Sequence, residues 1–196
     1  MRPMKYEKIA CKIKKAQTEK RFEHTLGVAY TAAALAMKYD IDVENARLAG
    51  LLHDCAKQLT DDKRIELCQK YDLPMSQIEM DNPFLLHGKV GKLIANKKFG
   101  ITDEDILNAI CFHTTGRPAM SLLEKIIFVS DYIEPNRKEA PNLIALRKLA
   151  FEDIDLCVVK ILEDTLQYLN GKKAAIDPAT QITYDYYVKE YVVNGK

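Results

Sequence analysis

Apolar residues recur every three or four positions along most of this chain, without a sustained alternation of apolar and polar residues. The segment 21–39 is typical, because Phe22, Leu26, Ala29 and Ala33 fall on one face of a helix. The chain has 8 Gly and 7 Pro among 196 residues, so few positions interrupt such helices. The pattern predicts an all-α fold with no sheet.

Capping residues, glycines and prolines set the boundaries of the expected helices. Thr102 with Asp105 and Ser121 with Glu124 have the spacing of capping boxes, and Gly100 is a typical residue after a helix end. The expected helices span about 5–16, 21–39, 42–56, 60–71, 82–100, 102–113, 121–134 and 141–171, the last being the longest. The tail TYDYYVKEYVV fits either a last helix or a strand. The length suits a single domain over residues 1–196.

Charge and composition exclude several classes of protein. The formal net charge is +1, which gives no global field for nucleic acid, and the basic segment 1–21 is interpreted as a solvated helix face. The apolar stretches are too short to cross a bilayer, and the charged start lacks the apolar core of a signal peptide. The five cysteines contain no C-x-x-C pair, which argues against a zinc ribbon or a disulfide framework. A cytoplasmic protein with no nucleic-acid or membrane partner is expected.

Histidine and aspartate residues interrupt the apolar helix faces. His53 and Asp54 lie inside the apolar segment ARLAGLLHDCAK, His24 lies on the preceding helix, and Asp131 interrupts IIFVSDYI. Imidazole and carboxylate groups are ligands for Fe, Mn, Co, Ni or Zn, so these segments together predict a metal site. The alternative is a set of core histidines and a buried aspartate, each satisfied by its own hydrogen bonds.

Cationic residues and further histidines follow these candidate ligands at short intervals. His87 and His113 lie at expected helix ends, and Lys57, four residues after His53 and three after Asp54, shares their helix face. The nearby cations are Arg21, Lys57, Arg117 and Arg137. They indicate an anionic, phosphate-bearing substrate beside the metal. No P-loop motif and no Ser-His-Asp arrangement stands out, so hydrolysis by metal-bound water fits best.

The order His24, His53-Asp54, Asp131 resembles the signature of the HD-domain metal-dependent phosphohydrolases. The segments RFEHTLGVA, AGLLHDCAK, LLHGKVG, HTTGRPAMSLLEKIIFVSDYIEPNR and IDPAT are similar to the YqeK-like symmetrical diadenosine tetraphosphatases of bacteria. The resemblance covers about residues 5–190. One departure is Asp177 and its neighbours in the tail, where that family often has a histidine.

This resemblance implies a single HD-domain helical bundle that cleaves diadenosine tetraphosphate in the middle to give two ADP. It implies iron as the favoured ion, with manganese or cobalt as alternatives, held by His24, His53, Asp54 and Asp131. One ion is favoured, and a second ion between Asp54, His87 and His113 stays open. Metal-bound hydroxide would attack an inner phosphorus. The implied catalytic residues are His87, His113, Lys57 and Asp54, with His87 or His113 donating a proton or hydrogen bond to the leaving ADP.

The resemblance also implies a nucleotide site that the tail at about 172–196 completes. Its residues are Arg21, His24, Lys57, Gln58, Leu59, Thr60, His87, His113, Thr114, Asp131, Arg137, Ala174, Ala175, Ile176, Asp177, Pro178 and Ala179. The ligand would be a dinucleoside polyphosphate or an ADP-like nucleotide, and a homodimer is compatible with the sequence. Two alternatives stay open: hydrolysis of a deoxynucleotide, a guanosine alarmone or a cyclic dinucleotide, and a sensor that binds metal and nucleotide without turnover.

Overall fold

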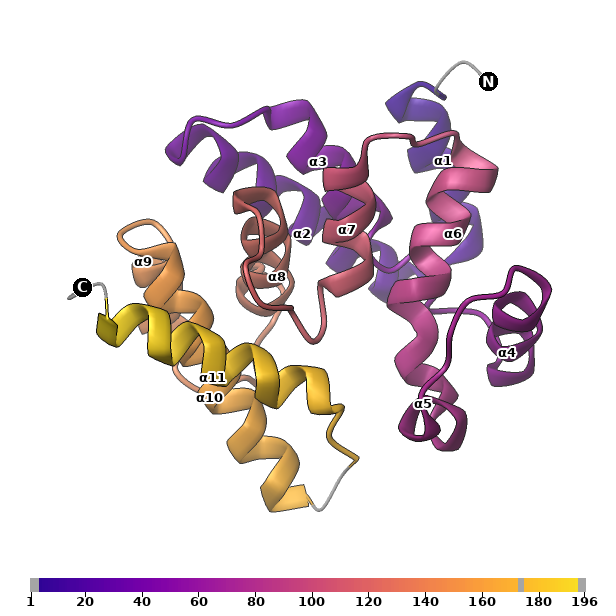
Figure 1. Ribbon diagram of the computed structural model, residues 1–196. Helices are drawn as coiled ribbons and strands as arrows, with labels where there is room; N and C mark the ends of the chain where they lie inside the picture. The colour runs from indigo at the N-terminus through magenta and orange to yellow at the C-terminus, as the bar shows by residue number, and fades with distance from the viewer. Residues whose placement is uncertain (1–3, 173–174, 194–196) are drawn as a thin grey trace.

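The computed structural model describes residues 4–172 and 175–193, and every regular element within those ranges is a helix (Figure 1). The prediction of an all-α fold is confirmed. The elements are α1 (Tyr6–Ala16), α2 (Glu19–Lys38), α3 (Val43–Leu52), α4 (Asp61–Lys70), α5 (Gln77–Asp81), the 3₁₀ helix η1 (Pro83–Leu86), α6 (His87–Phe99), α7 (Glu104–Phe112), α8 (Leu122–Ile133), α9 (Leu143–Leu149), α10 (Ile154–Lys172) and α11 (Pro178–Val193). Among the described residues, none of these helices has the length and apolarity that a membrane crossing needs.

Short polar side chains cap the helix starts, as the sequence suggests. The capping box of α8 is confirmed, because Ser121 Oγ accepts from Glu124 N at 3.1 Å and Glu124 Oε2 accepts from Ser121 N at 2.9 Å. The box predicted from Thr102 and Asp105 is wrong. Asp103 caps α7 instead, and its Oδ1 accepts from Asp105 N at 2.9 Å. A carboxylate at this position also interacts favourably with the positive end of the helix dipole.

The helix predicted over 42–56 is shorter than expected, and it ends directly before His53 and Asp54. α3 ends at Leu52, and tight turns carry the chain onward, with Lys57 N donating to Asp54 O at 3.0 Å. In a continued helix Gly50 O would accept from the backbone N–H four residues later. Here Gly50 O accepts from the His53 side chain at 2.6 Å, so the side chain competes with the next helical turn.

Three other boundaries differ from the predicted ones. The helix expected over 141–171 is two helices, α9 and α10, because Asp153 Oδ1 accepts from Leu156 N at 3.0 Å and starts a new helix. The helix expected over 82–100 begins as η1, and α6 proper starts at His87 and ends before Gly100, which has a φ of 76°. The tail forms the helix α11 rather than a strand.

The core lies where α2, α3, α7 and α8 pack together (Figure 1). α2 and α3 approach closely, since a Cβ on Gly50 would lie 2.8 Å from Ala29 Cα. One hydrophobic cluster extends from Ile9 in α1 to Tyr187 in α11. A smaller cluster beside α4 and α6 consists of Ala56, Cys68, Leu86 and Val90. The single-domain organisation stays a prediction.

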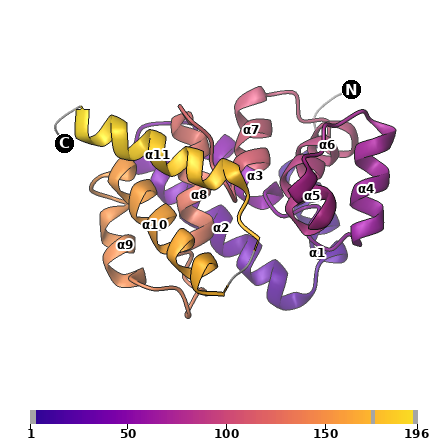
Figure 2. The ribbon, with the colours of Figure 1, turned by 60° about the horizontal axis from the view of Figure 1, so that its bottom comes forward.

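The last helix, α11, is hydrogen-bonded to the loop between α7 and α8. α11 packs along α10, as both views show (Figures 1 and 2). The Tyr187 hydroxyl accepts a hydrogen bond from Met120 N at 2.9 Å, and Tyr187 is only 6% exposed. Met120 belongs to the segment between α7 and α8. α11 therefore fixes the loop that follows His113.

Candidate metal centre

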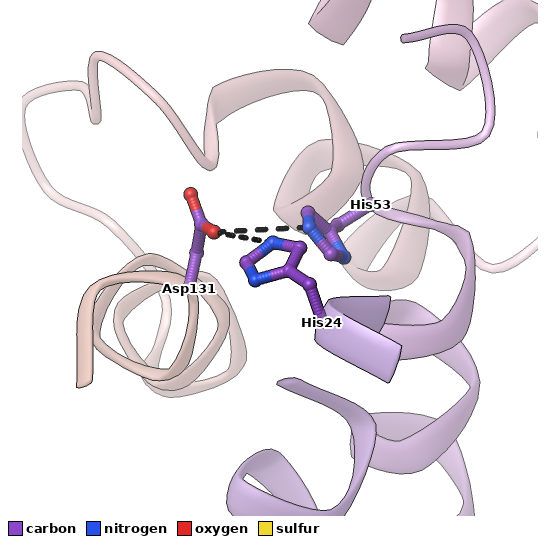
Figure 3. Close-up of side chains that lie close together, drawn as sticks. All are labelled: His24, His53 and Asp131. Atoms are coloured by element: carbon purple, nitrogen blue, oxygen red, sulfur yellow. Dashed lines mark ion pairs between the residues drawn. The ribbon is translucent and has the colours of Figure 1, made fainter. Parts of the chain in front are cut away.

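Three helices bring two histidines and an aspartate to one point (Figure 3). His24 projects from α2, His53 directly follows α3, and Asp131 lies on α8. Asp131 Oδ1 lies 3.1 Å from His24 Nε2 and 3.8 Å from His53 Nε2. The structure thus places three of the four predicted metal ligands together, although their helices are far apart in the sequence.

These side chains have the donor atoms and the burial that a metal ion requires. His24 Nε2 and His53 Nε2 are buried without a hydrogen-bond partner among the residues that the structure describes. One ligand atom from each histidine and from Asp131 can lie within 4.8 Å of the others. Buried polar atoms normally find a partner, and a nitrogen–oxygen donor set suits a divalent transition metal. The residues therefore fit such an ion.

Three of the four histidines owe their orientation to helix ends. The carbonyls in the last turn of a helix lack an intrahelical partner. Each of these imidazoles donates its Nδ1–H to a carbonyl three residues earlier, at a helix end: His53 to Gly50 at 2.6 Å, His87 to Phe84 at 2.7 Å and His113 to Ile110 at 2.8 Å. Phe84 O also accepts from the His87 backbone N–H. A neutral imidazole with a proton on Nδ1 presents a lone pair on Nε2. The local backbone thus prepares all three as ligands or acceptors.

His24 lies inside α2 and uses a distant carboxylate instead. Its Nδ1 contacts Glu134 Oε1 at 3.2 Å, and Glu134 is only 2% exposed. The backbone N–H of Asn136 donates to Glu134 Oε2 at 2.7 Å and fixes the carboxylate. A Cβ at Gly27 would overlap Glu134 Oε2, so the glycine makes room for it. Sequence reasoning missed Glu134, and the only available signal was an acidic residue closing an apolar helix.

Asp54 divides its two oxygens between two sides of the site. On one side, Arg21 donates to Asp54 Oδ2 at 2.9 Å, and His53 Nε2 lies 3.6 Å from the same oxygen. On the other side, Oδ1 lies 3.5 Å from His113 Nε2 and 3.6 Å from His87 Nε2. Asp54 is 3% exposed, so neither side is strongly screened by water. The predicted fourth ligand therefore contacts His53 and also faces a second group of residues.

That second group consists of His87, His113, Lys57 and Thr114. His87 Nε2 and His113 Nε2 lie 3.2 Å apart. Lys57 Nζ and Thr114 Oγ1 each lie 3.1 Å from His87 Nε2. Lys57 is thus near the site as predicted, but the turns after α3 bring it there rather than a shared helix face.

Burial and neighbouring charges shift the protonation of these groups. Burial, and to a lesser extent the charges of His113 and Lys57, lowers the pKa of His87 to about 3. Burial also lowers the pKa of His53 to about 4. Both imidazoles are neutral at neutral pH. Burial alone would also lower the pKa of His24, but its contacts with Asp131 and Glu134 outweigh burial and raise it. A proton and a metal ion therefore compete for His24 Nε2.

Neighbouring groups also keep the carboxylates of Asp54 and Asp131 ionised. Burial alone would raise the pKa of Asp131 and of Asp54. For Asp131 the close contact with His24 and the charge of His53 outweigh burial, and the net pKa lies well below the usual range. For Asp54 the charge of His53, together with the close contact with His113 and the charge of Lys57, has the same effect. Both aspartates are available as anionic ligands.

Of the predicted cations, Arg137 contacts a candidate metal-binding residue, whereas Arg117 contacts a residue at the start of α8. Arg137 reaches the site, because its NH2 donates to Asp131 O at 2.8 Å and to Asp131 Oδ1 at 3.3 Å. Arg117 instead donates through Nε and NH2 to Glu124 Oε1, at 3.1 and 3.0 Å. Arg117 therefore anchors the start of α8, and the suggestion that it faces the site phosphates is not supported by these contacts.

The remaining predicted residues lie in the segment that leads into α4 and in the tail. Gln58 is exposed, Leu59 packs against the small cluster beside α4, and Thr60 caps α4. The tail residues Asp177 and Ala179 line a pocket of about 210 Å³ together with Thr114. Ala175, Ile176 and Pro178 adjoin them at the start of α11, and Ala174 lies outside the described residues. The start of the tail helix thus lies beside the loop that carries His113.

Comparison with known proteins gives consistent matches. The family model of the HD domain matches residues 21–136. A symmetrical bis(5'-nucleosyl)-tetraphosphatase of Bacillus subtilis is 38% identical over 93% of this chain and 96% of its own length. The enzyme of the same name from Halalkalibacterium halodurans is 42% identical over 88% of this chain and 91% of its own. A crystal structure from Clostridium acetobutylicum, described as a predicted HD superfamily hydrolase involved in NAD metabolism, has a TM-score of 0.93 at 42% identity, covering 96% of this chain and 99% of its own.

Proposed function

The chain belongs to the HD-domain family, and from that premise we propose that it hydrolyses diadenosine tetraphosphate symmetrically to two ADP. Support comes from the relatives named symmetrical bis(5'-nucleosyl)-tetraphosphatase, which align over most of this chain. We further propose that it acts in the cytoplasm on the free nucleotide, without a nucleic-acid or membrane partner, and a homodimer is compatible with this function.

The observation that carries the proposal is the position of a candidate metal site directly beside a set of cations. His24 Nε2 and His53 Nε2 both face Asp131 Oδ1, at 3.1 and 3.8 Å. Neither nitrogen has a hydrogen-bond partner among the described residues. Arg21 and Lys57 flank Asp54 at 2.9 and 3.9 Å. A polyphosphate needs both, because charge accumulates on its oxygens as the bond to the leaving group breaks.

A divalent transition metal would be held by His24, His53, Asp54 and Asp131, with iron favoured and manganese or cobalt as alternatives. When bound, such an ion supplies a Lewis acid and makes water a nucleophile at neutral pH. Glu134 keeps the His24 imidazole turned so that Nε2 faces Asp131, and burial keeps His53 neutral and able to ligate.

The residues around the centre bind the polyphosphate and stabilise the departing ADP. Arg21 and Lys57 are each about one third exposed, so their charged ends can turn from Asp54 toward a bound phosphate. Arg137 is similarly exposed beside Asp131. His87 is neutral and its Nδ1–H is committed to Phe84 O, so its Nε2 accepts rather than donates. Lys57 Nζ is therefore the donor that we assign to the leaving phosphate oxygen.

Product analysis tests this function directly. Diadenosine tetraphosphate is incubated with the purified protein and Fe²⁺, Mn²⁺ or Co²⁺ in ¹⁸O-labelled water, and the nucleotides are separated by ion exchange. Attack at an inner phosphorus, with ADP as the leaving group, gives ADP as the only nucleotide product, with label in one ADP of each pair. Equal amounts of ATP and AMP would contradict symmetrical cleavage. Faster turnover of a deoxynucleotide, a guanosine alarmone or a cyclic dinucleotide would favour that substrate, and binding without turnover would favour a sensor.

A further inference from the structure

The turn of residues 134–137, called the α8 turn below, directly follows α8 and carries two residues of the site. Its first residue, Glu134, contacts His24, and its last residue, Arg137, donates to Asp131. The backbone of Glu134 is held by α8 itself, because its N–H donates to the carbonyl four residues earlier at 3.1 Å. Arg137 lies beyond the helix, so its position depends on what fixes the far end of the turn.

Arg147 of α9 bonds to both ends of the α8 turn. Its Nε donates to Ile133 O at 2.9 Å, and its NH2 donates to Glu134 O at 2.9 Å and to Arg137 O at 3.0 Å. One nitrogen therefore joins the first and the last carbonyl of the turn. Ile133 is the last residue of α8, where carbonyls lack an intrahelical partner and a positive charge is favourable. Arg147 thus caps α8 and closes the turn at once.

The helix that carries Arg147 is anchored at both of its ends. Before α9, Asn142 Nδ2 donates to Asp164 of α10, at 3.1 Å from Oδ1 and 3.2 Å from Oδ2. After α9, Ala150 O accepts from the hydroxyl of Tyr39, the residue that follows α2, at 2.7 Å. Between these anchors α9 packs against α8 and α10. α9 is therefore a fixed support from which Arg147 reaches the α8 turn.

We propose that Arg147 is a positioning residue for phosphate binding, which holds the α8 turn so that the Arg137 guanidinium stays beside Asp131. This inference rests on the proposed function, in which Arg137 binds the polyphosphate. Arg137 Nε and NH2 both donate to Asp131 O, at 3.1 and 2.8 Å, and this geometry requires the turn to stay closed. Without Arg147 the carbonyl of Arg137 loses its donor and the turn opens. Glu134 keeps its place in the last turn of α8, so phosphate binding should weaken while metal binding is retained.

Calorimetric titration of ADP into the Mn²⁺-loaded protein tests the inference without turnover. Arg147→Ala should lower the affinity for ADP by about 10–100-fold, the range expected for loss of a hydrogen bond to a charged group. The affinity of the apoprotein for Mn²⁺ should stay at the wild-type value. Arg147→Lys keeps a positive charge at the end of α8 but lacks the planar fork that reaches three carbonyls. It should therefore remain folded by thermal unfolding and still bind ADP more weakly than wild type does.

A double-mutant cycle separates positioning of Arg137 from a general loss of stability. If Arg147 acts through Arg137, the double variant Arg137→Ala/Arg147→Lys should bind ADP no more weakly than Arg137→Ala alone. Arg47→Ala is the matched control, because it removes a half-buried arginine that pairs with Glu44 and lies over the ring of Tyr6. This control should bind ADP as wild type does.

Three results would overturn the proposal. They are wild-type ADP affinity in Arg147→Lys, a fall in Mn²⁺ affinity as large as the fall in ADP affinity, and losses of ADP affinity that add in the double variant. Failure of the proposed function would be recognised in the wild-type protein. It would then neither bind ADP nor release ADP from diadenosine tetraphosphate, and the role of Arg137 would fall with that function.

Discussion

Removing the carboxylate behind His24 should weaken metal binding far more than it weakens the fold. In Glu134→Ala, His24 loses the only side-chain contact on Nδ1 that the described residues provide. The other three histidines keep their orientation through a carbonyl three residues earlier, whereas His24 depends on this one distant group. Loss of a group that orients a ligand costs about 10–100-fold in metal affinity. That factor corresponds to about 1.4–2.7 kcal/mol.

Gly27 allows the same effect to be produced without touching the carboxylate. A Cβ at Gly27 would overlap Glu134 Oε2 and lie 3.1 Å from Glu134 Cδ, so Gly27→Ala must displace the side chain. The expected loss of Mn²⁺ affinity is of the same size. If Gly27 acts through Glu134, the double variant Gly27→Ala/Glu134→Ala should bind no more weakly than Glu134→Ala alone.

The assay is calorimetric titration of Mn²⁺ into the apoprotein, with thermal unfolding of the same apoprotein as the control. Glu134→Ala also leaves Asn136 N without its acceptor, so some loss of apoprotein stability is expected, about 1–3 kcal/mol. The rearrangement at His24 predicts an additional loss in affinity. Wild-type Mn²⁺ affinity in a folded Glu134→Ala protein would refute the idea that Glu134 orients His24.

Further predictions concern the metal, the packing of α2 on α3 and the acid limit of stability. His53→Ala should lose bound metal by elemental analysis and nearly all activity while its circular dichroism stays helical. Gly50→Ala should lower the free energy of unfolding in urea by about 1–3 kcal/mol, because the added Cβ meets Ala29 backbone at 2.8 Å. Burial alone would raise the pKa of Glu79, but Lys89 and nearby hydrogen bonds hold it below the ordinary 4.5. Its stabilisation is present above that ordinary value and disappears as the pH falls through the lowered one, so Glu79→Gln should flatten the acid side of the stability curve.

The fold class and the meeting of the candidate metal-binding side chains could be predicted from the sequence, because both depend on local patterns. Helical periodicity and capping residues predicted the all-α fold and the capping box of Ser121. Histidine and aspartate on apolar faces predicted that His24, His53 and Asp131 meet, since such groups are costly in a core unless they share a partner.

What could not be predicted depends on competition between side chains and backbone, or on contacts distant in sequence. The end of α3 at Leu52 follows from the hydrogen bond of His53 to Gly50 O, which no periodicity reveals. Glu134 follows an apolar helix and precedes a proline, so it has the pattern of an ordinary helix end, and its role depends on α2. Arg117 has the sequence position of a site cation, but it binds Glu124 of the α8 capping box.

The hydrogen bond between Tyr187 and Met120 joins α11 to the loop that follows His113. Loss of activity and unfolding of the helices should therefore occur at different temperatures. α11 packs against α10 and fixes, through Tyr187, the loop that follows His113, while α2, α3 and α8 form the buried centre. Peripheral helices open at lower free energy than a buried core. Warming should therefore detach α11 first and disorder the loop that follows His113. At that temperature the circular dichroism should still show α2, α3 and α8 as helical. Activity should be lost at a lower temperature than the one at which the helices unfold, and cooling between the two should restore it.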